Sequence, residues 1–263
     1  EARLVARAGN PTVDRPTPAS SPAATSPTAT AAAPASSVLP LPDPQIEALV
    51  RRAVYDQLPD AQLGRAAGMD IPPAPRLVVN ISARHIHLNQ QAMDVLFGAG
   101  AELTVQKMLY QQGPFASEQT VSVFGPRKQM IANVRILGPL REYNQVELAF
   151  TDARFLGIDA PVRISSDTAG TPGCYLVGPA GGLELDHGVI RAARHVHMNP
   201  AEAEYYGVEP GDPMRLVIDG DQGGVLEGLI SRISDKECLE VHIDTDEGNA
   251  VDLANARKVH LEK

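Results

Sequence analysis

Two short segments of the sequence carry a pair of histidines separated by one residue. They are Arg84–His87 (Arg-His-Ile-His) and Arg194–His197 (Arg-His-Val-His). Along a β-strand, residues i and i+2 point to the same face, so each pair places two imidazoles side by side. One metal ion can bind two ligands with this spacing. A single pair is a weak signal, because both histidines can equally be exposed or hydrogen-bonded, but two pairs in matching surroundings favour metal binding.

The surroundings of the two pairs are duplicated. Each pair is followed by an apolar residue, an asparagine (Asn89 or Asn199), a helix-like stretch and a turn containing glycine. We expect each asparagine to cap the helix that follows it through its side-chain oxygen. Further downstream, each copy has an apolar strand with one metal-binding side chain, Glu147 in the first and His242 in the second. This alignment makes the two positions equivalent and predicts a pseudo-twofold pair of small barrels.

The candidate ligands comprise five of the seven histidines and one glutamate. They are His85, His87, Glu147, His195, His197 and His242. Imidazole and carboxylate ligands without thiolates suit Zn²⁺ in a catalytic site. Six ligands exceed the needs of one tetrahedral ion, so we expect two zinc ions per chain, roughly 3.5–4 Å apart as in other two-metal sites. A single ion whose ligands are supported by the remaining histidines is the alternative. Glu118 is a rival carboxylate, ranked below Glu147 because it has no equivalent in the second copy.

Three arginines could hold an anion near these ligands. Arg141, in the segment Gly-Pro-Leu-Arg, lies just ahead of the strand that carries Glu147. A guanidinium binds phosphate or carboxylate through two parallel hydrogen bonds. The alternative for Arg141 is a surface ion pair with a neighbouring carboxylate such as Glu142 or Asp152. Arg84 and Arg194 either contact the substrate or face solvent.

Motifs for other chemistries are missing. The sequence has no G-x-S-x-G elbow, no Walker loop and no dinucleotide-binding loop. We interpret the glycine-rich segment 178–182 as a turn. The net charge of −9 and the lack of a basic block argue against a nucleic-acid partner. No apolar stretch approaches the roughly 20 residues that a membrane span requires, and Cys174 and Cys238 are too few for a disulfide framework.

Short strands must position the candidate ligands. The chain has no Trp and only 4% aromatic residues, so its core must consist of Val, Ile, Leu and Ala. From Arg76 onward, short β-rich runs alternate with turn signals, which predicts a sandwich or barrel. The predicted strands are Leu77–Ile81, Thr120–Phe124, Met130–Leu137, Gln145–Phe150, Val162–Ile164, Met214–Ile218, Val225–Ile233 and Leu239–Ile243. Helix is expected only in short pieces, around 89–97 and 200–206.

The first 75 residues differ in composition from the rest. Residues 1–43 are dominated by Pro, Ala, Ser and Thr and bury too little apolar surface to fold, which predicts a disordered, flexible linker. In the segment 44–75, apolar residues recur at helical spacing from Pro44 to about Leu58, followed by a loop. This pattern predicts an amphipathic helix. The helix docks either on its own globular domain or on a partner protein.

Several motifs together resemble PduL-type phosphate acyltransferases. They are the two Arg-His-[Ile/Val]-His segments, the stretch Gly-Pro-Leu-Arg…Gln-Val-Glu, and the sequence Val-His-Ile-Asp-Thr-Asp-Glu-Gly-Asn-Ala near the C-terminus. The resemblance runs from roughly Arg76 to Lys263. It implies a mainly β fold of two pseudo-symmetric small β-barrels with short helical caps. Residues 76–190 would form the first barrel repeat and 191–263 the second, with the first strand, 76–83, joining the second barrel.

The resemblance also implies an activity. Family members transfer an acyl group between coenzyme A and inorganic phosphate, so acyl-CoA and phosphate are the expected substrates. The six candidate ligands would bind the metal, and Arg141 would bind phosphate. Because the sequence has no convincing nucleophile, we expect direct attack of phosphate on the thioester. The same ligands are also compatible with a dinuclear zinc hydrolase or with a non-catalytic interaction protein whose barrels are stabilised by metal.

A cellular location follows from the same resemblance. Family members act in the lumen of bacterial microcompartments, which they reach through a short amphipathic peptide on a flexible tether. The implied partners are shell or core proteins bound through the N-terminal region, either by residues 1–8 or by the helix at 44–58. We also expect a homo-oligomer, a dimer or larger.

Overall fold

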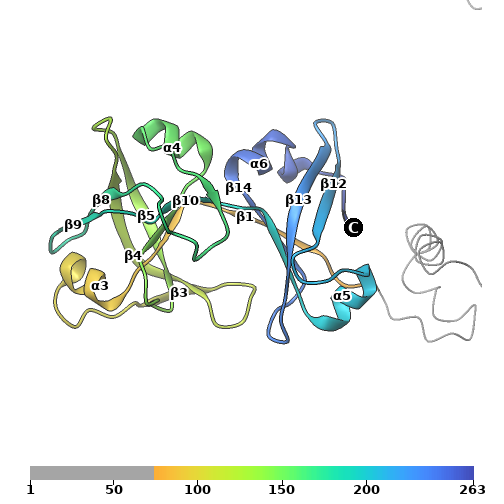
Figure 1. The fold of residues 1–263 in the computed structure, drawn as a ribbon, viewed down its shortest axis with the longest axis horizontal. Helices are drawn as coiled ribbons and strands as arrows, with labels where there is room; N and C mark the ends of the chain where they lie inside the picture. The colour runs from red at the N-terminus through yellow and green to blue at the C-terminus, as the bar shows by residue number, and fades with distance from the viewer. Residues whose placement is uncertain (1–73) are drawn as a thin grey trace, which may run out of the picture. The chain divides into compact units, whose positions relative to one another are not determined.

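The structure, a computed structural model, describes residues 74–263. The linker predicted over 1–43 and the helix predicted from Pro44 to Leu58 lie outside the described residues. The described part is mainly β, with two curled sheets and a few short helices (Figure 1), which confirms the predicted fold class. None of the helices between residues 74 and 263 has the length and apolar character needed to span a bilayer.

The first sheet contains nine strands of the described chain. Their order is β7-β10-β6-β2-β5-β4-β8-β9, with β3 paired to β4. Their bounds are β2 (His85–His87), β3 (Val105–Met108), β4 (Phe115–Phe124), β5 (Met130–Gly138), β6 (Gln145–Glu147), β7 (Val162–Arg163), β8 (Cys174–Val177), β9 (Gly182–Leu185) and β10 (Val189–Ala192). Two helices belong to this half, α3 (Gln90–Phe97) and α4 (Phe150–Leu156). Residues 178–181 of the glycine-rich segment form the predicted turn between β8 and β9, and Gly182 begins β9.

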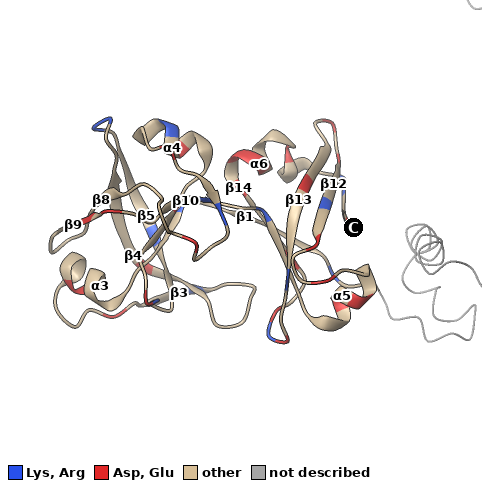
Figure 2. Ribbon diagram, in the orientation of Figure 1, with Lys and Arg blue, Asp and Glu red and all other residues tan. Residues whose placement is uncertain are grey.

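The second sheet contains six strands in the order β1-β14-β11-β13-β12-β15. Their bounds are β1 (Val78–Ser82), β11 (His195–Met198), β12 (Pro213–Asp219), β13 (Gly224–Ile233), β14 (Glu240–Asp244) and β15 (Lys258–Glu262). This half carries the helices α5 (Pro200–Tyr206) and α6 (Thr245–Ala250) and the short 3₁₀ helix η1 (Leu253–Asn255). Lys and Arg residues are dispersed along the ribbon in both halves of the described chain (Figure 2).

The two sheets exchange their leading strands. β1 pairs in parallel with β14 of the second sheet, but the chain then enters β2 of the first sheet. β10 pairs in parallel with β6 of the first sheet, and the chain then enters β11 of the second. The sequence-based repeat boundary at residue 191 therefore falls inside β10. Each Arg-His-X-His segment lies where the chain crosses from one sheet to the other (Figure 1).

Each half has its own hydrophobic core, built almost entirely from aliphatic residues and methionine. The middle residue of each histidine pair anchors it in one of these cores. Ile86 is fully buried in the first core, and Val196 is fully buried in the second. Because neighbouring residues of a strand point to opposite faces, this burial directs the histidines on either side away from the core. The packing of one apolar side chain thus sets the direction of two imidazoles.

The two predicted helix caps are confirmed. The side-chain oxygen of Asn89 accepts a hydrogen bond from the backbone N–H of Ala92, and that of Asn199 accepts one from Glu202. Glu202 also accepts a hydrogen bond from the backbone N–H of Asn199, which completes a capping box.

Asn199→Ala should lower the free energy of unfolding by about 1 kcal/mol, because the substitution removes the side-chain acceptor at the start of α5. Chemical denaturation of the full chain measures this loss. Asn199→Asp keeps an acceptor and should leave stability close to wild type. Equal stability of the alanine variant and the wild type would contradict the capping role.

The helices α4 and α6 correct the sequence-based expectation. A strand was predicted over Gln145–Phe150, but β6 ends at Glu147 and α4 begins at Phe150. The expectation that helix occurs only at 89–97 and 200–206 is therefore wrong. The helix α4 forms because Ala153 and Leu156, at helical spacing, are buried in the first core. The helix α6 begins with a capping box formed by Asp244 and Glu247.

Candidate metal centre

The first ligand group joins β2 to its antiparallel neighbour β6. His85 lies opposite Glu147 in the register of the two strands. Nε2 of His85 lies 3.4 Å from Oε2 of Glu147, and Nε2 of His87 lies 3.9 Å from Oε1. All three side chains are buried, and their ligand atoms lie within 4.8 Å of one another. We call these three residues the first triad.

The second group repeats this arrangement on β11 and β14. His195 lies opposite His242, in the same register that places His85 opposite Glu147. The rings of His195 and His242 stack with their centroids 4.9 Å apart, and His197 meets both rings edge-on. The ligand atoms again lie within 4.8 Å of one another. We call His195, His197 and His242 the second triad.

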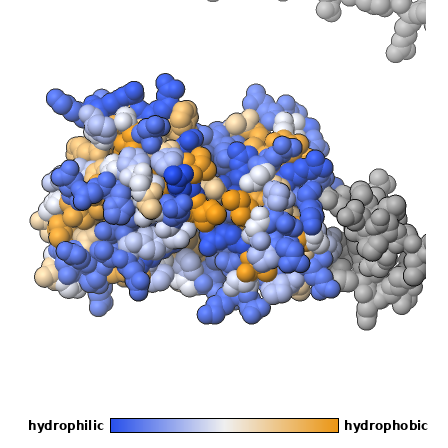
Figure 3. Space-filling view, in the orientation of Figure 1, coloured by the Kyte–Doolittle hydropathy of each residue, from blue (hydrophilic) through white to orange (hydrophobic). Residues whose placement is uncertain are grey.

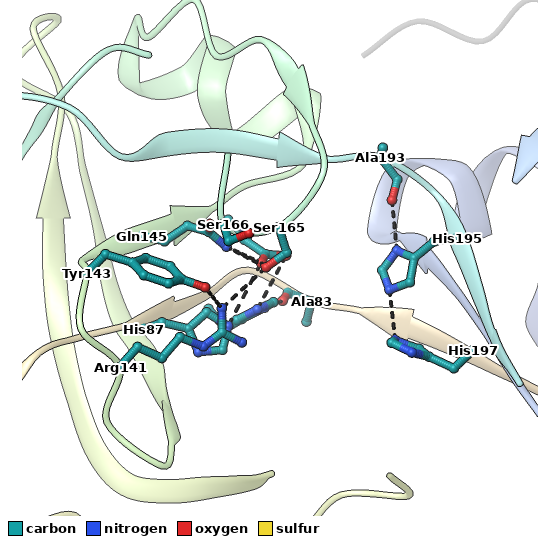
Figure 4. Close-up of polar contacts among 12 residues, drawn as sticks. Ala83, His87, Arg141, Tyr143, Gln145, Ser165, Ser166, Ala193, His195 and His197 are labelled. Atoms are coloured by element: carbon teal, nitrogen blue, oxygen red, sulfur yellow. Dashed lines mark hydrogen bonds and ion pairs between the residues drawn. The ribbon is translucent and has the colours of Figure 1, made fainter. Parts of the chain in front are cut away.

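In each triad, a backbone carbonyl accepts a hydrogen bond from one histidine ring and so fixes which ring nitrogen carries the proton. Nδ1 of His85 lies 2.8 Å from the carbonyl oxygen of Ala83, and Nδ1 of His195 lies 2.9 Å from that of Ala193 (Figure 4). A carbonyl oxygen can only accept a hydrogen bond, so Nδ1 is the donor in both rings. The lone pair of the neutral ring is then on Nε2. Metal-binding histidines are commonly oriented by such a contact at the other ring nitrogen.

Three of the histidines are neutral at neutral pH. Burial lowers the pKa of His195 and of His197 to about 3, and the neighbouring His242 adds to the effect. Burial also lowers the pKa of His87 to about 3, assisted by His85. Metal ions bind deprotonated imidazole, so these rings need not lose a proton first.

His85 and Glu147 each favour the charged form of the other, so their pKa values move in opposite directions. Burial opposes the charged form of His85, but attraction to Glu147 outweighs burial and raises the pKa of His85. Burial also opposes the carboxylate form of Glu147, but His85 and His87 outweigh it and lower the pKa of Glu147. Glu147 is therefore a carboxylate at neutral pH, which is the form that binds a cation.

The second triad contains a contact that fits a cation. Nε2 of His195 and Nε2 of His197 lie only 3.1 Å apart. Nδ1 of His195 is the donor to Ala193, and Nδ1 of His197 lies 2.8 Å from a carboxylate oxygen of Glu237. The lone pair on Nε2 of His195 therefore faces Nε2 of His197, which becomes a second ligand atom when the proton of that ring is on Nδ1. Two ring nitrogens this close together, with a ligand atom of His242 within 4.8 Å of each, fit the binding of one metal ion.

Arg141 lies beside the first triad. Its backbone N–H donates to the carbonyl of Leu88, which follows the first histidine pair. Its guanidinium donates to the hydroxyl oxygen of Tyr143 at 2.7 Å and to that of Ser165 at 3.3 Å (Figure 4). Within residues 74–263, no ion pair joins Arg141 to a carboxylate. The surface pairing considered as the alternative is therefore not seen, and the charge is free for an anionic ligand.

Arg84 and Arg194 are engaged elsewhere. Arg84 forms an ion pair of 2.7 Å with Asp152 of α4, and Arg194 forms one of 2.8 Å with Glu247 of α6. These equivalent contacts connect each crossing segment to the helix that follows the third ligand of a triad. The rival carboxylate Glu118 is exposed on β4 and belongs to neither triad.

Several polar residues of the site were missed by sequence reasoning. Gln145 donates to Oε1 of Glu147 at 2.6 Å, and Ser165 donates to the same oxygen at 3.1 Å. The backbone N–H of Ser166 donates to the side-chain oxygen of Gln145 at 2.8 Å. Gln145 could have been found, because it precedes Glu147 by two residues and shares its face of the strand. The Ser165–Ser166 loop after β7 carries no such signal.

The two triads open onto one pocket. Its lining includes Glu147 of the first triad and His195 and His242 of the second, together with Ala193. Figure 3 shows apolar side chains gathered near the middle of the face in view, where the two halves of the described chain meet. Residues of both triads therefore line the same pocket.

Several known proteins with similar sequences are named phosphate propanoyltransferase. A family model described as phosphate propanoyltransferase matches residues 78–254. A phosphate propanoyltransferase from Planctopirus limnophila is 55% identical over 221 residues, which cover 83% of this chain and 90% of the relative. A protein of the same name from Thermotoga maritima is 44% identical over 71% of this chain and 89% of the relative. Another, from Salmonella typhimurium, is 47% identical over 67% of this chain and 84% of the relative.

Proposed function

The chain belongs to the phosphate propanoyltransferase family of PduL-type acyltransferases, and we propose that it transfers a short acyl group between coenzyme A and inorganic phosphate at two metal ions. A member of this family is an acyltransferase, which excludes the alternative of a non-catalytic interaction protein. The observation that carries the proposal is the pair of equivalent triads on one pocket, with the unpaired charge of Arg141 beside the first.

Each triad holds one metal ion in this proposal. The ligands are His85, His87 and Glu147 in one triad and His195, His197 and His242 in the other, and their nitrogen and oxygen donors suit Zn²⁺. Zn²⁺ bound there supplies positive charge that stabilises the oxyanion of the reacting carbonyl and the leaving thiolate.

Arg141 binds the phosphate. Tyr143 and Ser165 hold the guanidinium from one side, so its remaining N–H groups can face an anion in the site. A fixed guanidinium orients a phosphate oxygen toward the thioester carbonyl and reduces the entropic cost of bringing the two substrates together. The phosphate oxygen forms the new bond to the acyl carbon, and the sulfur–carbon bond breaks to release coenzyme A.

No covalent enzyme intermediate is part of the proposal. Of the two cysteines, Cys174 is buried in the first core, and burial raises the pKa of its thiol to about 12. Such a thiol is a poor nucleophile at neutral pH. In this proposal phosphate attacks the thioester directly.

Loss of acyl-CoA should require phosphate and should yield acyl phosphate in equal amount. Measuring thioester absorbance and free thiol with and without phosphate tests this expectation, and initial rates at varied concentrations of both substrates should give a sequential pattern. Release of coenzyme A without phosphate would instead identify the alternative, a dinuclear zinc hydrolase. A ping-pong pattern or an isolated acyl-enzyme would contradict direct attack.

The acyl group that we propose is short, propanoyl or acetyl. The named relatives are propanoyltransferases. The two acyl groups differ by one methylene, which a pocket distinguishes by about 1–3 kcal/mol. We further propose a location in the lumen of a bacterial microcompartment, reached through the N-terminal region, and a homo-oligomeric state; both rest on the family resemblance.

A further inference from the structure

A buried carboxylate lies beside the third ligand of the second triad. Glu240 precedes His242 by two residues on β14, so both side chains lie on the same face of the strand. Oε2 of Glu240 lies 3.0 Å from Nε2 of His242, and this buried ring nitrogen has no other polar partner among residues 74–263. Glu240 is 1% exposed. A carboxylate this deeply buried is costly unless other groups donate hydrogen bonds to it.

Two amides from distant parts of the chain supply those hydrogen bonds. Nδ2 of Asn80, on the exchanged strand β1, donates to Oε1 of Glu240 at 3.2 Å. Nε2 of Gln111 donates to Oε2 at 2.9 Å. Gln111 lies in the turn between β3 and β4, so a hairpin of the first sheet reaches the second triad.

Gln111 is itself held at both ends of its amide. Its Nε2 donates to the carbonyl of Cys238 at 2.8 Å, and its Oε1 accepts a hydrogen bond from the backbone N–H of Cys238 at 3.0 Å. This two-point contact with the backbone just before β14 fixes the amide. The donor that Gln111 offers to Glu240 therefore has a defined position.

In the first triad, Gln145 occupies the position that Glu240 occupies in the second, but Gln145 donates a hydrogen bond where Glu240 accepts one. Gln145 lies opposite His87 in the register of β2 and β6, and Glu240 lies opposite His197 in the register of β11 and β14. Gln145 donates a hydrogen bond to the carboxylate Glu147. At the matching position, Glu240 offers an acceptor to an imidazole. Each third ligand thus has a partner of complementary polarity two residues earlier.

We propose that Glu240 and Gln111 are positioning residues for the second triad: Gln111 fixes Glu240, and Glu240 fixes the imidazole of His242 beside His195 and His197. The inference rests on the proposed metal-dependent function. Through Gln111, the β3–β4 hairpin of the first sheet then helps to position a ligand of the second triad. Contacts of this kind behind a metal ligand typically change metal affinity by about 10–100-fold.

The test measures zinc affinity of the full chain by competition with a chromophoric chelator. His85→Ala removes a ligand of the first triad, so zinc bound in that background reports on the second triad. His195→Ala serves in the same way to report on the first. The variants Glu240→Gln and Gln111→Ala are placed in each background. Gln112→Ala, at the exposed neighbouring position of the same turn, is the matched control.

In the His85→Ala background, Glu240→Gln should weaken zinc binding about 10–100-fold, and Gln111→Ala should weaken it in the same direction. Gln112→Ala should leave it unchanged. Because Gln111 acts through Glu240, the double variant should bind zinc no more weakly than Glu240→Gln alone. In the His195→Ala background, all three variants should bind zinc as their parent does.

Two results would overturn the inference and leave the proposed function intact. One is wild-type zinc affinity of the second triad in both Glu240→Gln and Gln111→Ala. The other is equal weakening in both backgrounds, which indicates a general loss of structure. If the wild-type chain binds no zinc, the proposed function fails, and the inference fails with it.

Discussion

His195→Ala should reduce bound zinc from two ions per chain to one and lower phosphate-dependent transfer at least 10³-fold. His195 contacts both other members of the second triad, so its loss removes a ligand and the partner that aligns His197 and His242. A metal ion contributes several kcal/mol of transition-state stabilisation, and a 10³-fold loss corresponds to about 4 kcal/mol. Elemental analysis and turnover measured on the same purified samples check both values.

His187→Ala is the matched control for this experiment. His187 is exposed and belongs to neither triad. Its replacement should leave the zinc content and the rate unchanged. If His195→Ala kept two zinc ions and the wild-type rate, the second triad would not be a catalytic metal site.

Arg141→Ala should lower kcat/KM for phosphate by about 10²–10⁴-fold while zinc content stays at the wild-type value. The change removes two hydrogen bonds to a charged ligand, each contributing roughly 1.5–3 kcal/mol. Arg141→Lys keeps the charge but loses the planar two-point contact, so it should fall between the wild type and the alanine variant. Initial rates at varied phosphate and saturating acyl-CoA provide the measurement.

Arg215→Ala is the control for loss of a positive charge. Arg215 lies on β12 of the second sheet and pairs with Glu262, away from both triads. It should leave kcat/KM for phosphate unchanged. An Arg141→Ala variant with normal phosphate kinetics would contradict the assignment of Arg141 to phosphate.

Local sequence patterns predicted the parts of this site that depend on strand geometry. The period of two within a strand placed His85 beside His87 and His195 beside His197, and the fully buried Ile86 and Val196 show why it did so. The duplicated pattern also led to the fold class that the structure confirms. These predictions are correct because they concern residues close in sequence, for which backbone geometry alone decides which side chains share a face.

Local patterns did not predict several features that depend on distant contacts. Gln111 meets Cys238 across 127 residues, and no local pattern relates the two. The exchange of β10 into the first sheet also depends on parallel pairing with β6 and β7, which only the folded chain reveals. The helices α4 and α6 are intermediate cases, because their short length hid the helical period although a capping box marks the start of α6.

The most direct test of the central claim is a zinc titration of chelator-treated enzyme, followed by phosphate-dependent consumption of acyl-CoA. If each triad binds one catalytic ion, the metal-free enzyme should be inactive, and the rate should rise until two equivalents of zinc per chain are bound. Full activity without metal, or activity that is complete at one equivalent, would contradict a site built from two triads.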